Sequence, residues 1–308
     1  MSSSVEVAVG ERVLRVSNLE KVLYPDVGFT KAEVIDYYAR IADYMLPHLV
    51  GRCMTFRRWP DGVAEKSFFE KNCPNHRPEW MLTAPGPGGS DRSKNPREKA
   101  VSRIEYCCID EPASLVWAAN MASLELHSPM ALASDLASPT MVVFDLDPGS
   151  PATIVECCQT ALELQEVLAM LDMRCWAKTS GQKGLQVYVP VNQTCTHTDA
   201  ANFALAMGKL LAKRLPNLIL VEMAKELRPG KVFVDWSQNS FHKTTIAPYS
   251  LRGGSKPTVS TPLTWDEVRL GADGGALRFT AGQVLDRVEG LGDLFGPTQT
   301  MVQSLPHS

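Results

Sequence analysis

Residues 141–149 (MVVFDLDPG) end an apolar run with two acidic side chains. The run is rich in the β-branched and aromatic residues that favour a buried strand, and Pro-Gly ends it. Residues i and i+2 of a strand point to the same face, so Asp145 and Asp147 lie together while Leu146 turns into the core. Two buried ionised carboxylates are unfavourable unless a cation pairs with them. This strand is therefore expected to deliver a pair of acidic groups to a site.

A second apolar run, residues 232–236 (VFVDW), ends in a third carboxylate, Asp235. Carboxylates without His or Cys favour hard cations such as Mg²⁺ or Mn²⁺, and two-metal phosphoryl-transfer sites hold ions about 3.5–4 Å apart. The alternative is that Asp145 and Asp147 cap a helix that begins near Gly149. Capping accounts for one aspartate, but not for two on one face together with a matching strand.

Composition excludes several classes of protein. The chain has 308 residues, 44% hydrophobic and 21% charged, as in a globular protein rather than a disordered or fibrous one. No apolar run reaches the roughly 18 residues that span a bilayer, so we expect no membrane association. The N-terminus lacks the basic and apolar regions of a signal peptide, which predicts a cytoplasmic location.

The eight cysteines are expected to be free thiols that serve as small hydrophobic residues. Four of them form adjacent pairs at 107–108 and 157–158, and no CxxC occurs. Residues 73–76 (CxxH) and 195–197 (CxH) each have the spacing of half a zinc site. A closed structural site needs four ligands, so we do not expect zinc.

Charge is distributed unevenly along the chain. The net charge of −3 does not by itself indicate a nucleic-acid-binding protein. Basic residues are nevertheless concentrated in 92–103 and 209–256, whereas the segment from residue 261 onward is acidic. Basic runs are usually solvated surfaces, but two of them flanking acidic strand ends indicate a polyanionic ligand.

Hydrophobic periodicity predicts an α+β fold with a mixed or antiparallel central sheet flanked by helices, because strands and helices do not alternate regularly. Helices are predicted at 31–49, with Thr30 as N-cap, and at 112–122, 152–171, 198–215 and 280–289. Strands are predicted at 54–57, 124–127, 141–147, 174–178, 185–189, 231–236 and 244–247. Residues 84–96, rich in Gly, Pro and Ser, are predicted to be a loop. We expect one domain, 1–308, with the first 50 or so residues as a candidate subdomain.

Residues 179–184 (TSGQKG) join two of the predicted strands. Glycines that expose backbone N–H groups, the Ser180 hydroxyl and the Lys183 charge would suit a phosphate, although a plain hairpin is the alternative. His127 ends another apolar run, where a histidine more often has a structural role. Cations that would offset a triphosphate flank Asp235 in the sequence: Arg228, Lys243 and Arg252.

Together these motifs resemble the polymerase domain of bacterial ligase D, a primase–polymerase of the archaeo-eukaryotic primase superfamily that acts in non-homologous end joining. The resemblance covers about residues 12–290, which leaves 1–11 and 291–308 as terminal extensions, and implies an archaeo-eukaryotic primase-like fold. The matching motifs are NLEKVLYP (18–25), RRWPDG (57–62), FFEK (68–71), LVWAANMASLELHSP (115–129), FDLDPG (144–149), TSGQKGLQVYVP (179–190), KVFVDWSQNS (231–240) and KTTIAPYSLRG (243–253).

The resemblance implies roles for individual residues. The catalytic, metal-binding carboxylates match Asp145, Asp147 and Asp235. Positions that contact the triphosphate and sugar of the incoming nucleotide match His127, Ser180, Lys183, Arg228, Lys243 and Arg252. The groups that grip the 5′-phosphate of the downstream strand match Lys21 and Lys31, and an aromatic pair that stacks on the template matches Phe68 and Phe69. From the residues alone, Lys21 and Lys31 could equally be ordinary surface groups in contact with solvent. Phe68 and Phe69 would be better explained as core residues.

Two departures from the family pattern stand out. The family usually has a histidine two residues after the second glycine of the phosphate turn, and here that position is Gln186. Glutamine can donate a hydrogen bond to a phosphate oxygen but has no positive charge, so we expect altered nucleotide affinity rather than loss of chemistry. Residues 84–100 also match poorly, and in this family such a loop influences how DNA ends or primers are held.

The implied activity is template-dependent addition of nucleotides, with NTPs and Mn²⁺ preferred, to 3′-OH primers at gaps and broken ends. One cation would lower the pKa of the 3′-hydroxyl and the other would hold the β,γ-phosphates, so that attack on the α-phosphate expels pyrophosphate. The sequence has no Lys-x-Asp-Gly ligase motif, so the expected partners are a separate DNA ligase, Ku, gapped DNA and NTP or dNTP, with a nucleoid-associated location. A primer-independent primase and a non-catalytic DNA end-binding or synapsis module are the alternatives.

Overall fold

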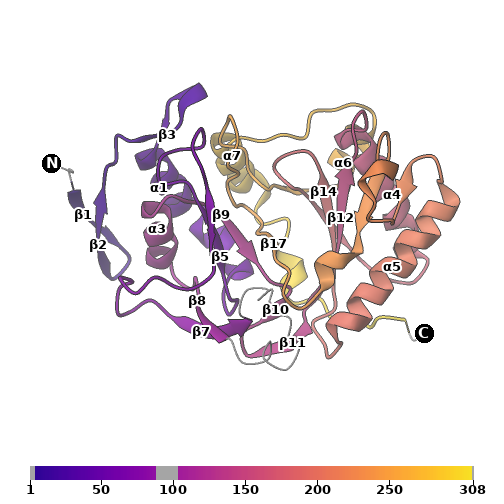
Figure 1. Cartoon of the computed structure of the whole chain (residues 1–308), viewed down its shortest axis with the longest axis horizontal. Helices are drawn as coiled ribbons and strands as arrows, with labels where there is room; N and C mark the ends of the chain where they lie inside the picture. The colour runs from indigo at the N-terminus through magenta and orange to yellow at the C-terminus, as the bar shows by residue number, and fades with distance from the viewer. Residues whose placement is uncertain (1–3, 88–102, 307–308) are drawn as a thin grey trace. The chain divides into compact units, whose positions relative to one another are not determined.

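The computed structural model describes residues 4–87 and 103–306 (Figure 1). Contacts between Cα atoms divide the chain into two units, each built from two separate segments. The first unit comprises Met1–Leu136 and Thr244–Pro257, and the second comprises Ala137–Lys243 and Thr258–Ser308. The expectation of a single domain stays a prediction.

A six-stranded mixed sheet forms the centre of the second unit, as the sequence predicted. Its order is β15 (Ile219–Leu220), β16 (Val232–Asp235), β12 (Met141–Pro148), β14 (Leu185–Pro190), β13 (Trp176–Thr179) and β18 (Pro262–Leu263). Only the β15–β16 pair is parallel; the other pairs are antiparallel. The apolar run of residues 141–147 therefore lies inside the sheet, between two partners.

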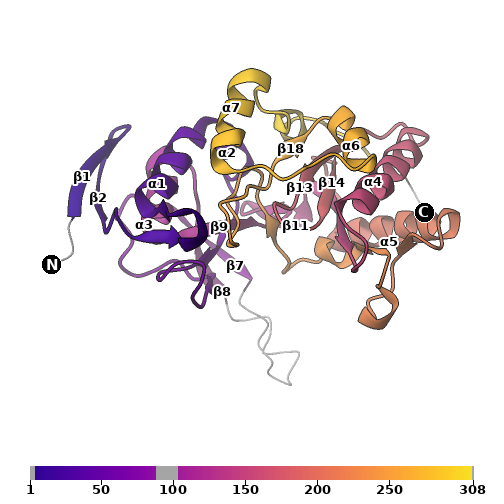
Figure 2. The same cartoon turned by 90° about the horizontal axis from the view of Figure 1, so that it is seen from above.

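Two long helices of this unit cover one face of the sheet. Helices α4 (Ile154–Ala169) and α5 (His197–Arg214) bury Cys157, Leu164 and Phe203 in the same core as Val142, Phe144 and Leu146 of β12. Because side chains alternate along a strand, Asp145 and Asp147 lie on the opposite face. Figures 1 and 2 show α4 and α5 along the sheet. Helix α6 (Trp265–Ala272) packs against α4, and α7 (Ala281–Leu291) follows it in the chain. Shorter helical turns are η3 (Lys225–Leu227), η4 (Trp236–Asn239) and η5 (Gly296–Gln299).

A four-stranded antiparallel sheet and three short α-helical segments form the first unit. The sheet order is β17 (Thr245–Ile246), β9 (Ser123–Ser128), β5 (Thr55–Arg58) and β6 (Phe68–Glu70). The other strands of this unit pair as β1 (Ser4–Val9) with β2 (Arg12–Ser17), β3 (Val22–Tyr24) with β4 (Phe29–Thr30), and β7 (Thr83–Pro87) with β8 (Arg103–Cys107). Strand β10 (Ala131–Leu132) pairs with β11 (Asp135–Pro139), whose last three residues belong to the second unit. The helices are α1 (Lys31–Arg40), α2 (Ala42–Met45) and α3 (Pro112–Asn120), with 3₁₀ turns η1 (Pro25–Val27) and η2 (Leu46–His48).

Buried tyrosines attach the segment Thr244–Pro257 to the first unit. The Tyr37 hydroxyl donates to the Tyr249 carbonyl at 2.7 Å, and the Tyr24 hydroxyl donates to the Arg252 carbonyl at 2.9 Å. Tyr38 donates to the Leu124 carbonyl of β9 at 2.7 Å. Burial raises the pKa of all three phenols, so they remain neutral donors. These bonds hold Arg252 beside β9.

Several predicted elements differ from the structure. The helix predicted at 31–49 begins at Lys31, with Thr30 as its N-cap in a capping box with Glu33, as expected. It breaks after Arg40, however, and ends in the η2 turn at Pro47, which has no N–H to donate. Part of the loop predicted at 84–96 is wrong, because residues up to Pro87 belong to β7; the rest lies outside the described residues. Helix α6 was missed.

Beyond the end of β16, the Asn239 side chain forms the hydrogen bonds to β12 that a neighbouring strand would otherwise form. Asn239 is completely buried, and its Nδ2 donates to the Val143 carbonyl at 2.8 Å and to the Trp236 carbonyl at 3.0 Å. Its Oδ1 accepts from the Val143 N–H at 2.8 Å. The Asn239 amide therefore gives both backbone groups of Val143 a hydrogen-bond partner, immediately beyond the pairing of Asp145 with Asp235.

We predict that Asn239→Ala lowers the free energy of unfolding by about 3 kcal/mol, because both backbone groups of Val143 lose their partner. Urea denaturation measures this change. Asn217→Ala, at an exposed position of the same unit, is the matched control and is expected to cost less than about 0.5 kcal/mol. Equal costs for the two variants would contradict the role assigned to Asn239.

Candidate active site

The register of β12 with β16 places Asp235 directly opposite Asp145. Residues opposite one another in an antiparallel pair have Cβ atoms about 4.5–5.5 Å apart. Asp147 lies two residues further along β12 on the same face and is opposite Phe233. The prediction that two chain segments bring three acidic side chains together is therefore confirmed. The capping alternative is wrong, because α4 begins at Ile154 with Thr153 as its N-cap.

Burial and neighbouring negative charge shift the titration of Asp145 and Asp147. Burial, together with the nearby charges of Asp147 and Asp235, raises the pKa of Asp145 to about 7, although Gln186 and Lys178 act in the other direction. Burial and the charge of Asp235 also raise the pKa of Asp147, and Arg228 partly offsets that rise. The positive charge near Asp145 and Asp147 therefore does not offset their burial and the neighbouring negative charge.

The acidic groups fit a hard divalent cation by their chemistry. All three donors are carboxylates, which suit Mg²⁺ or Mn²⁺, and a cation would offset the burial and the neighbouring negative charge that raise the pKa of Asp145. Asp235 already has other partners: its Oδ1 accepts from the Ser237 N–H at 3.0 Å and hydroxyl at 2.6 Å, and its Oδ2 accepts from Gln238 at 3.1 Å. Within residues 4–87 and 103–306, no three His, Cys, Asp or Glu side chains are arranged to hold an ion.

Gln186 and Lys178 continue the row of Asp145 and Asp235 across the sheet. Gln186 Nε2 donates to Asp145 Oδ1 at 3.0 Å, so this residue contacts a carboxylate, whereas the sequence analysis placed it against a phosphate. Lys178 is completely buried and donates to Gln186 Oε1 at 2.5 Å and to Ser260 Oγ at 2.7 Å. Sequence reasoning missed Lys178, although a lysine inside an apolar strand signals a buried polar partner.

The turn between β13 and β14 lies against the end of β12. Its strands pair as a hairpin, and Ser180 Oγ accepts from the Gln182 and Gly184 N–H groups at 3.3 and 3.1 Å. A Cβ on Gly184 would lie 2.4 Å from the Leu146 carbonyl oxygen and 3.6 Å from Asp147 Oδ1, so only glycine permits this approach. Gly184 is therefore held near Asp147, and Ser180 is bonded to Gly184, whereas Lys183 is exposed.

Arg228 lies beside the same carboxylates. Its Cζ atom is 3.8 Å from the centre of the Phe233 ring, and its Nη2 donates to the Met223 carbonyl at 2.9 Å. Its Nε is buried without a hydrogen-bond partner among the described residues. A Cβ on Gly149 would lie 2.1 Å from the Arg228 carbonyl oxygen, so the glycine of the DPG motif allows this contact. Lys243 is half-buried after η4.

In the first unit, His127 and Arg252 meet at Glu125, a residue that the sequence analysis did not select. His127 Nε2 lies 2.9 Å from Glu125 Oε2, and Arg252 Nε lies 3.4 Å from Glu125 Oε1. Burial alone would raise the pKa of Glu125, but the hydrogen bond from His127 and the charge of Arg252 hold it below its usual value. Burial lowers the pKa of His127, so this imidazole is neutral at pH 7.

The two predicted phosphate-binding lysines are neighbours in the first unit. The Lys31 N–H donates to the Lys21 carbonyl at 2.8 Å, and Lys31 is buried, with its Nζ donating to the Ser17 carbonyl at 2.7 Å. Burial, with the charges of Lys21 and Arg58, lowers the pKa of Lys31 to about 8. Lys31 is therefore not a solvated surface group, whereas Lys21 pairs with Asp61 at 2.8 Å.

Phe68 and Phe69 are exposed, which excludes the core-packing alternative: 44% and 58% of their surfaces are accessible. Both belong to β6, at the edge of the sheet. Arg58 lies over the Phe68 ring and Arg57 over the Phe69 ring, each with Cζ 5.3 Å from the ring centre. The rings are thus held by cations and remain accessible to a planar ligand.

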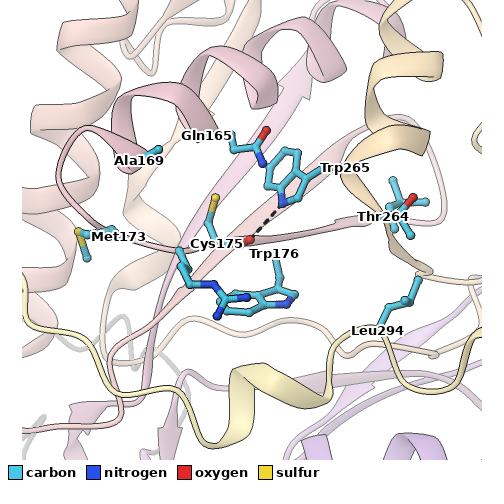
Figure 3. Close-up of a pocket in the computed structure, with 10 residues that line it drawn as sticks. Gln165, Ala169, Met173, Cys175, Trp176, Thr264, Trp265 and Leu294 are labelled. Atoms are coloured by element: carbon cyan, nitrogen blue, oxygen red, sulfur yellow. Dashed lines mark hydrogen bonds between the residues drawn. The ribbon is translucent and has the colours of Figure 1, made fainter.

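A separate cavity of about 420 Å³ lies at the other end of β13 (Figure 3). Its lining includes Trp176, Trp265 and Arg174. Trp265 Nε1 donates to the Cys175 carbonyl at 3.2 Å, as Figure 3 shows. This cavity shares no lining residue with the acidic site.

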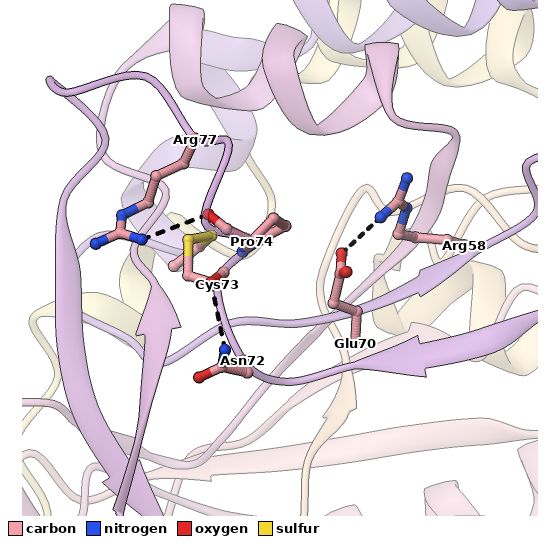
Figure 4. The surroundings of a disulfide bond; sticks show 7 residues. Arg58, Glu70, Asn72, Cys73, Pro74 and Arg77 are labelled. Atoms are coloured by element: carbon pink, nitrogen blue, oxygen red, sulfur yellow. Dashed lines mark hydrogen bonds and ion pairs between the residues drawn. A yellow bond between two sulfur atoms is a disulfide. The ribbon is translucent and has the colours of Figure 1, made fainter.

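The zinc half-site at 73–76 is not formed, because Cys73 is bonded to Cys107 in a disulfide (Figure 4). The expectation of free thiols is therefore wrong for these two residues. Their Cα atoms lie 4.9 Å apart because the Cys73 N–H donates to the Glu105 carbonyl of β8 at 2.6 Å. Sequence spacing gave no signal of this contact. The other cysteines in the described ranges are free.

We predict that Asp145→Asn stabilises the metal-free protein, and more so at pH 8 than at pH 5. The unfolded chain loses this proton near pH 3.8, whereas the folded protein keeps it until about pH 7, so wild-type stability falls as the pH rises through that interval. The gain at pH 8 is on the order of 2–4 kcal/mol.

Denaturant unfolding in the presence of a chelator tests this prediction. Asp266→Asn, at an aspartate whose side chain is 90% exposed, is the control and should show no such pH dependence. A destabilised Asp145→Asn protein at pH 8 would show that the fold does not disfavour the charged form of Asp145.

Comparison with known proteins identifies similar chains. Residues 30–295 match the family model described as LigD, primase-polymerase domain. The chain is 43% identical over 289 residues to the multifunctional non-homologous end joining protein LigD of Mycolicibacterium smegmatis and 30% identical over 277 residues to the bifunctional LigD of Bacillus subtilis. These alignments cover 93% and 90% of this chain but only 36% and 42% of the relatives, so the chain spans about two fifths of their length.

A solved structure has the same fold. The polymerase domain of Mycobacterium tuberculosis ligase D, in complex with DNA, superposes with a TM-score of 0.84 and 36% sequence identity. The match covers 95% of this chain and 100% of that one. The predicted α+β primase-like fold is therefore confirmed. No helix within the described residues has the length and apolar character needed to cross a bilayer.

Proposed function

The chain belongs to the family of LigD primase-polymerase domains, and from this we propose that it is a nucleotidyltransferase that extends DNA ends during non-homologous end joining. It would add nucleotides to 3′-OH primers at gaps and broken ends, directed by a template. The observation on which this proposal depends is the strand register that places Asp235 opposite Asp145, beside Asp147. Relatives named for end joining, and a similar domain solved with DNA, support it.

Asp145, Asp147 and Asp235 are the residues that would hold Mn²⁺ or Mg²⁺. Such ions would supply charge that activates the attacking hydroxyl and offsets the triphosphate. The protein itself fixes the orientation of Asp145 through Gln186, whose Oε1 is occupied by Lys178 and whose Nε2 must therefore face the carboxylate. The metal-binding face is thus positioned by a buried hydrogen-bond chain.

Basic and hydroxyl groups near the carboxylates suit the triphosphate. We assign Ser180, Lys183, Arg228 and Lys243 of the second unit to it. The Arg228 Nε, buried without a partner, is a donor for a phosphate oxygen. In the first unit, we assign His127 and Arg252 to the incoming nucleotide.

The first unit also suits DNA. Lys21 and Lys31, with Arg58 nearby, concentrate positive charge that we assign to the 5′-phosphate at the far side of a gap. Phe68 and Phe69 are assigned to stacking on the template, which tolerates any sequence. We further propose that NTPs and Mn²⁺ are preferred, and that Ku and a separate DNA ligase act on the same ends.

We predict that Asp147→Asn reduces the rate of primer extension on a 5′-phosphorylated gap by at least about 100-fold. Replacing a residue that only bonds to a metal ligand typically lowers metal affinity or activity 10- to 100-fold, and a ligand itself should matter at least as much. The assay supplies Mn²⁺ with either NTPs or dNTPs. Asp286→Asn, on the exposed face of α7, is the control and should retain wild-type rates.

Other results would favour the alternatives. Wild-type activity in Asp147→Asn, or none in either protein, would indicate a non-catalytic end-binding module. New products on a circular single-stranded template without a primer would indicate a primase.

We also predict that a 5′-phosphorylated gap takes up protons when it binds near pH 8. The pKa of Lys31 is lowered to about 8 in the free protein, and an adjacent phosphate would raise it again, so about half a proton is gained at that pH. Calorimetry in buffers with different ionisation enthalpies measures this uptake. The same gap with a 5′-hydroxyl should show none, and equal uptake by the two substrates would remove Lys31 from the phosphate site.

A further inference from the structure

Glu125 is completely buried, yet its carboxylate contacts groups from three parts of the first unit. His127, two residues along β9, bonds to Oε2 at 2.9 Å. The Gly253 N–H donates to Oε1 at 3.0 Å, and Arg252 Nε lies 3.4 Å from the same oxygen. Arg57 of β5 lies 3.7 Å from Oε2. Each oxygen of this one carboxylate therefore faces two donors.

The cluster has an excess of positive charge. Glu125 supplies one negative charge against the two guanidinium groups of Arg57 and Arg252, because His127 is neutral at pH 7. The Arg252, His127 and Arg57 side chains are 13%, 12% and 32% exposed, whereas that of Glu125 is fully covered. Solvent-facing groups with a net charge of about +1 suit an anionic ligand, and Glu125 can act on that ligand only through its neighbours.

Close packing fixes the contact with Gly253. A Cβ on Gly253 would lie 2.1 Å from Cζ2 of Trp59, so only glycine brings this backbone N–H to Glu125. Arg57 lies over Trp59, with Cζ 4.6 Å from the ring centre, and also over Phe69. The Phe69 ring contacts the His127 ring edge-on at 5.6 Å. The Glu125 carboxylate thus orders the segment with Arg252 and Gly253. Through Arg57 and His127 it also supports Phe69, the residue assigned to the template.

A carboxylate also dictates which nitrogen of His127 bears the proton. A carboxylate can only accept hydrogen bonds, so the neutral imidazole must carry its hydrogen on Nε2, the nitrogen that faces Glu125. Nδ1 is then the nitrogen without a proton. The orientation and the tautomer of His127 both follow from Glu125.

We propose that Glu125 is a positioning residue for nucleotide binding. From its buried position it aligns the His127 and Arg252 side chains, and it sets the tautomer of His127. This inference rests on the proposed function, because it needs an incoming nucleotide at those two side chains. Glu125 does not touch the nucleotide. It acts equally on the bound substrate and on the transition state, so its loss weakens binding more than it slows chemistry.

Glu125→Gln is the direct test. An amide of the same size has one accepting atom and one donating group, so it cannot satisfy donors on both sides as the carboxylate does. We expect the KM for ATP in primer extension to rise by at least about 10-fold, while kcat changes by less than about 3-fold. Glu125→Asp keeps the charge and should show a smaller rise in KM.

Glu111→Gln is the matched control. Glu111 pairs with Arg12 at 3.1 Å in the same unit, without contact to the Glu125 cluster, and should leave KM unchanged. If Glu125→Gln and Glu111→Gln have the same KM as the wild type, Glu125 is merely structural and the inference fails.

The tautomer of His127 is measured in the wild-type protein, so this readout does not require Glu125→Gln to fold. ¹⁵N NMR of the wild-type protein, with the signal assigned by its absence in His127→Gln, should show the Nε2–H form at pH 7.5. The Nδ1–H form would overturn the inference. These outcomes differ from failure of the proposed function, in which the wild-type protein would show no primer extension at all.

Discussion

The antiparallel pairing of β12 with β16 sets two like charges opposite one another, and the rest of the candidate site follows from it. Without a cation, the charged form of Asp145 is unfavourable, because burial and the neighbouring charges of Asp147 and Asp235 raise its pKa. The fold maintains it because Val142, Phe144 and Leu146 on the other face of β12 are fully buried under helices. Hydrophobic burial thus outweighs a local electrostatic cost that serves binding.

Both units use the same device to position functional groups. In the second unit, buried Lys178 orients Gln186, which in turn donates to Asp145. In the first, buried Glu125 holds His127 and Arg252. In each case a charge removed from solvent acts through a neighbouring side chain, where a low local dielectric makes the orientation firm.

The sequence predicted the parts of the molecule that depend on local pattern. The strand with Asp145 and Asp147 could be identified because alternation and composition agree, and Thr30 could be identified as a cap from its own chemistry. Glu125, Lys178 and the Cys73–Cys107 disulfide could not, because each depends on partners distant in sequence. Helix α6 was predictable from Thr264 and Glu267, which form its capping box.

We propose that carboxylates from two chain segments share cations, and Mn²⁺ binding tests this proposal most directly. Electron paramagnetic resonance titration with a non-hydrolysable ATP analogue would compare the wild-type protein with Asp147→Asn and Asp235→Asn. We expect both variants to bind Mn²⁺ at least about 10-fold more weakly, although the residues lie on different strands. Unchanged affinity in Asp235→Asn would contradict a shared metal site.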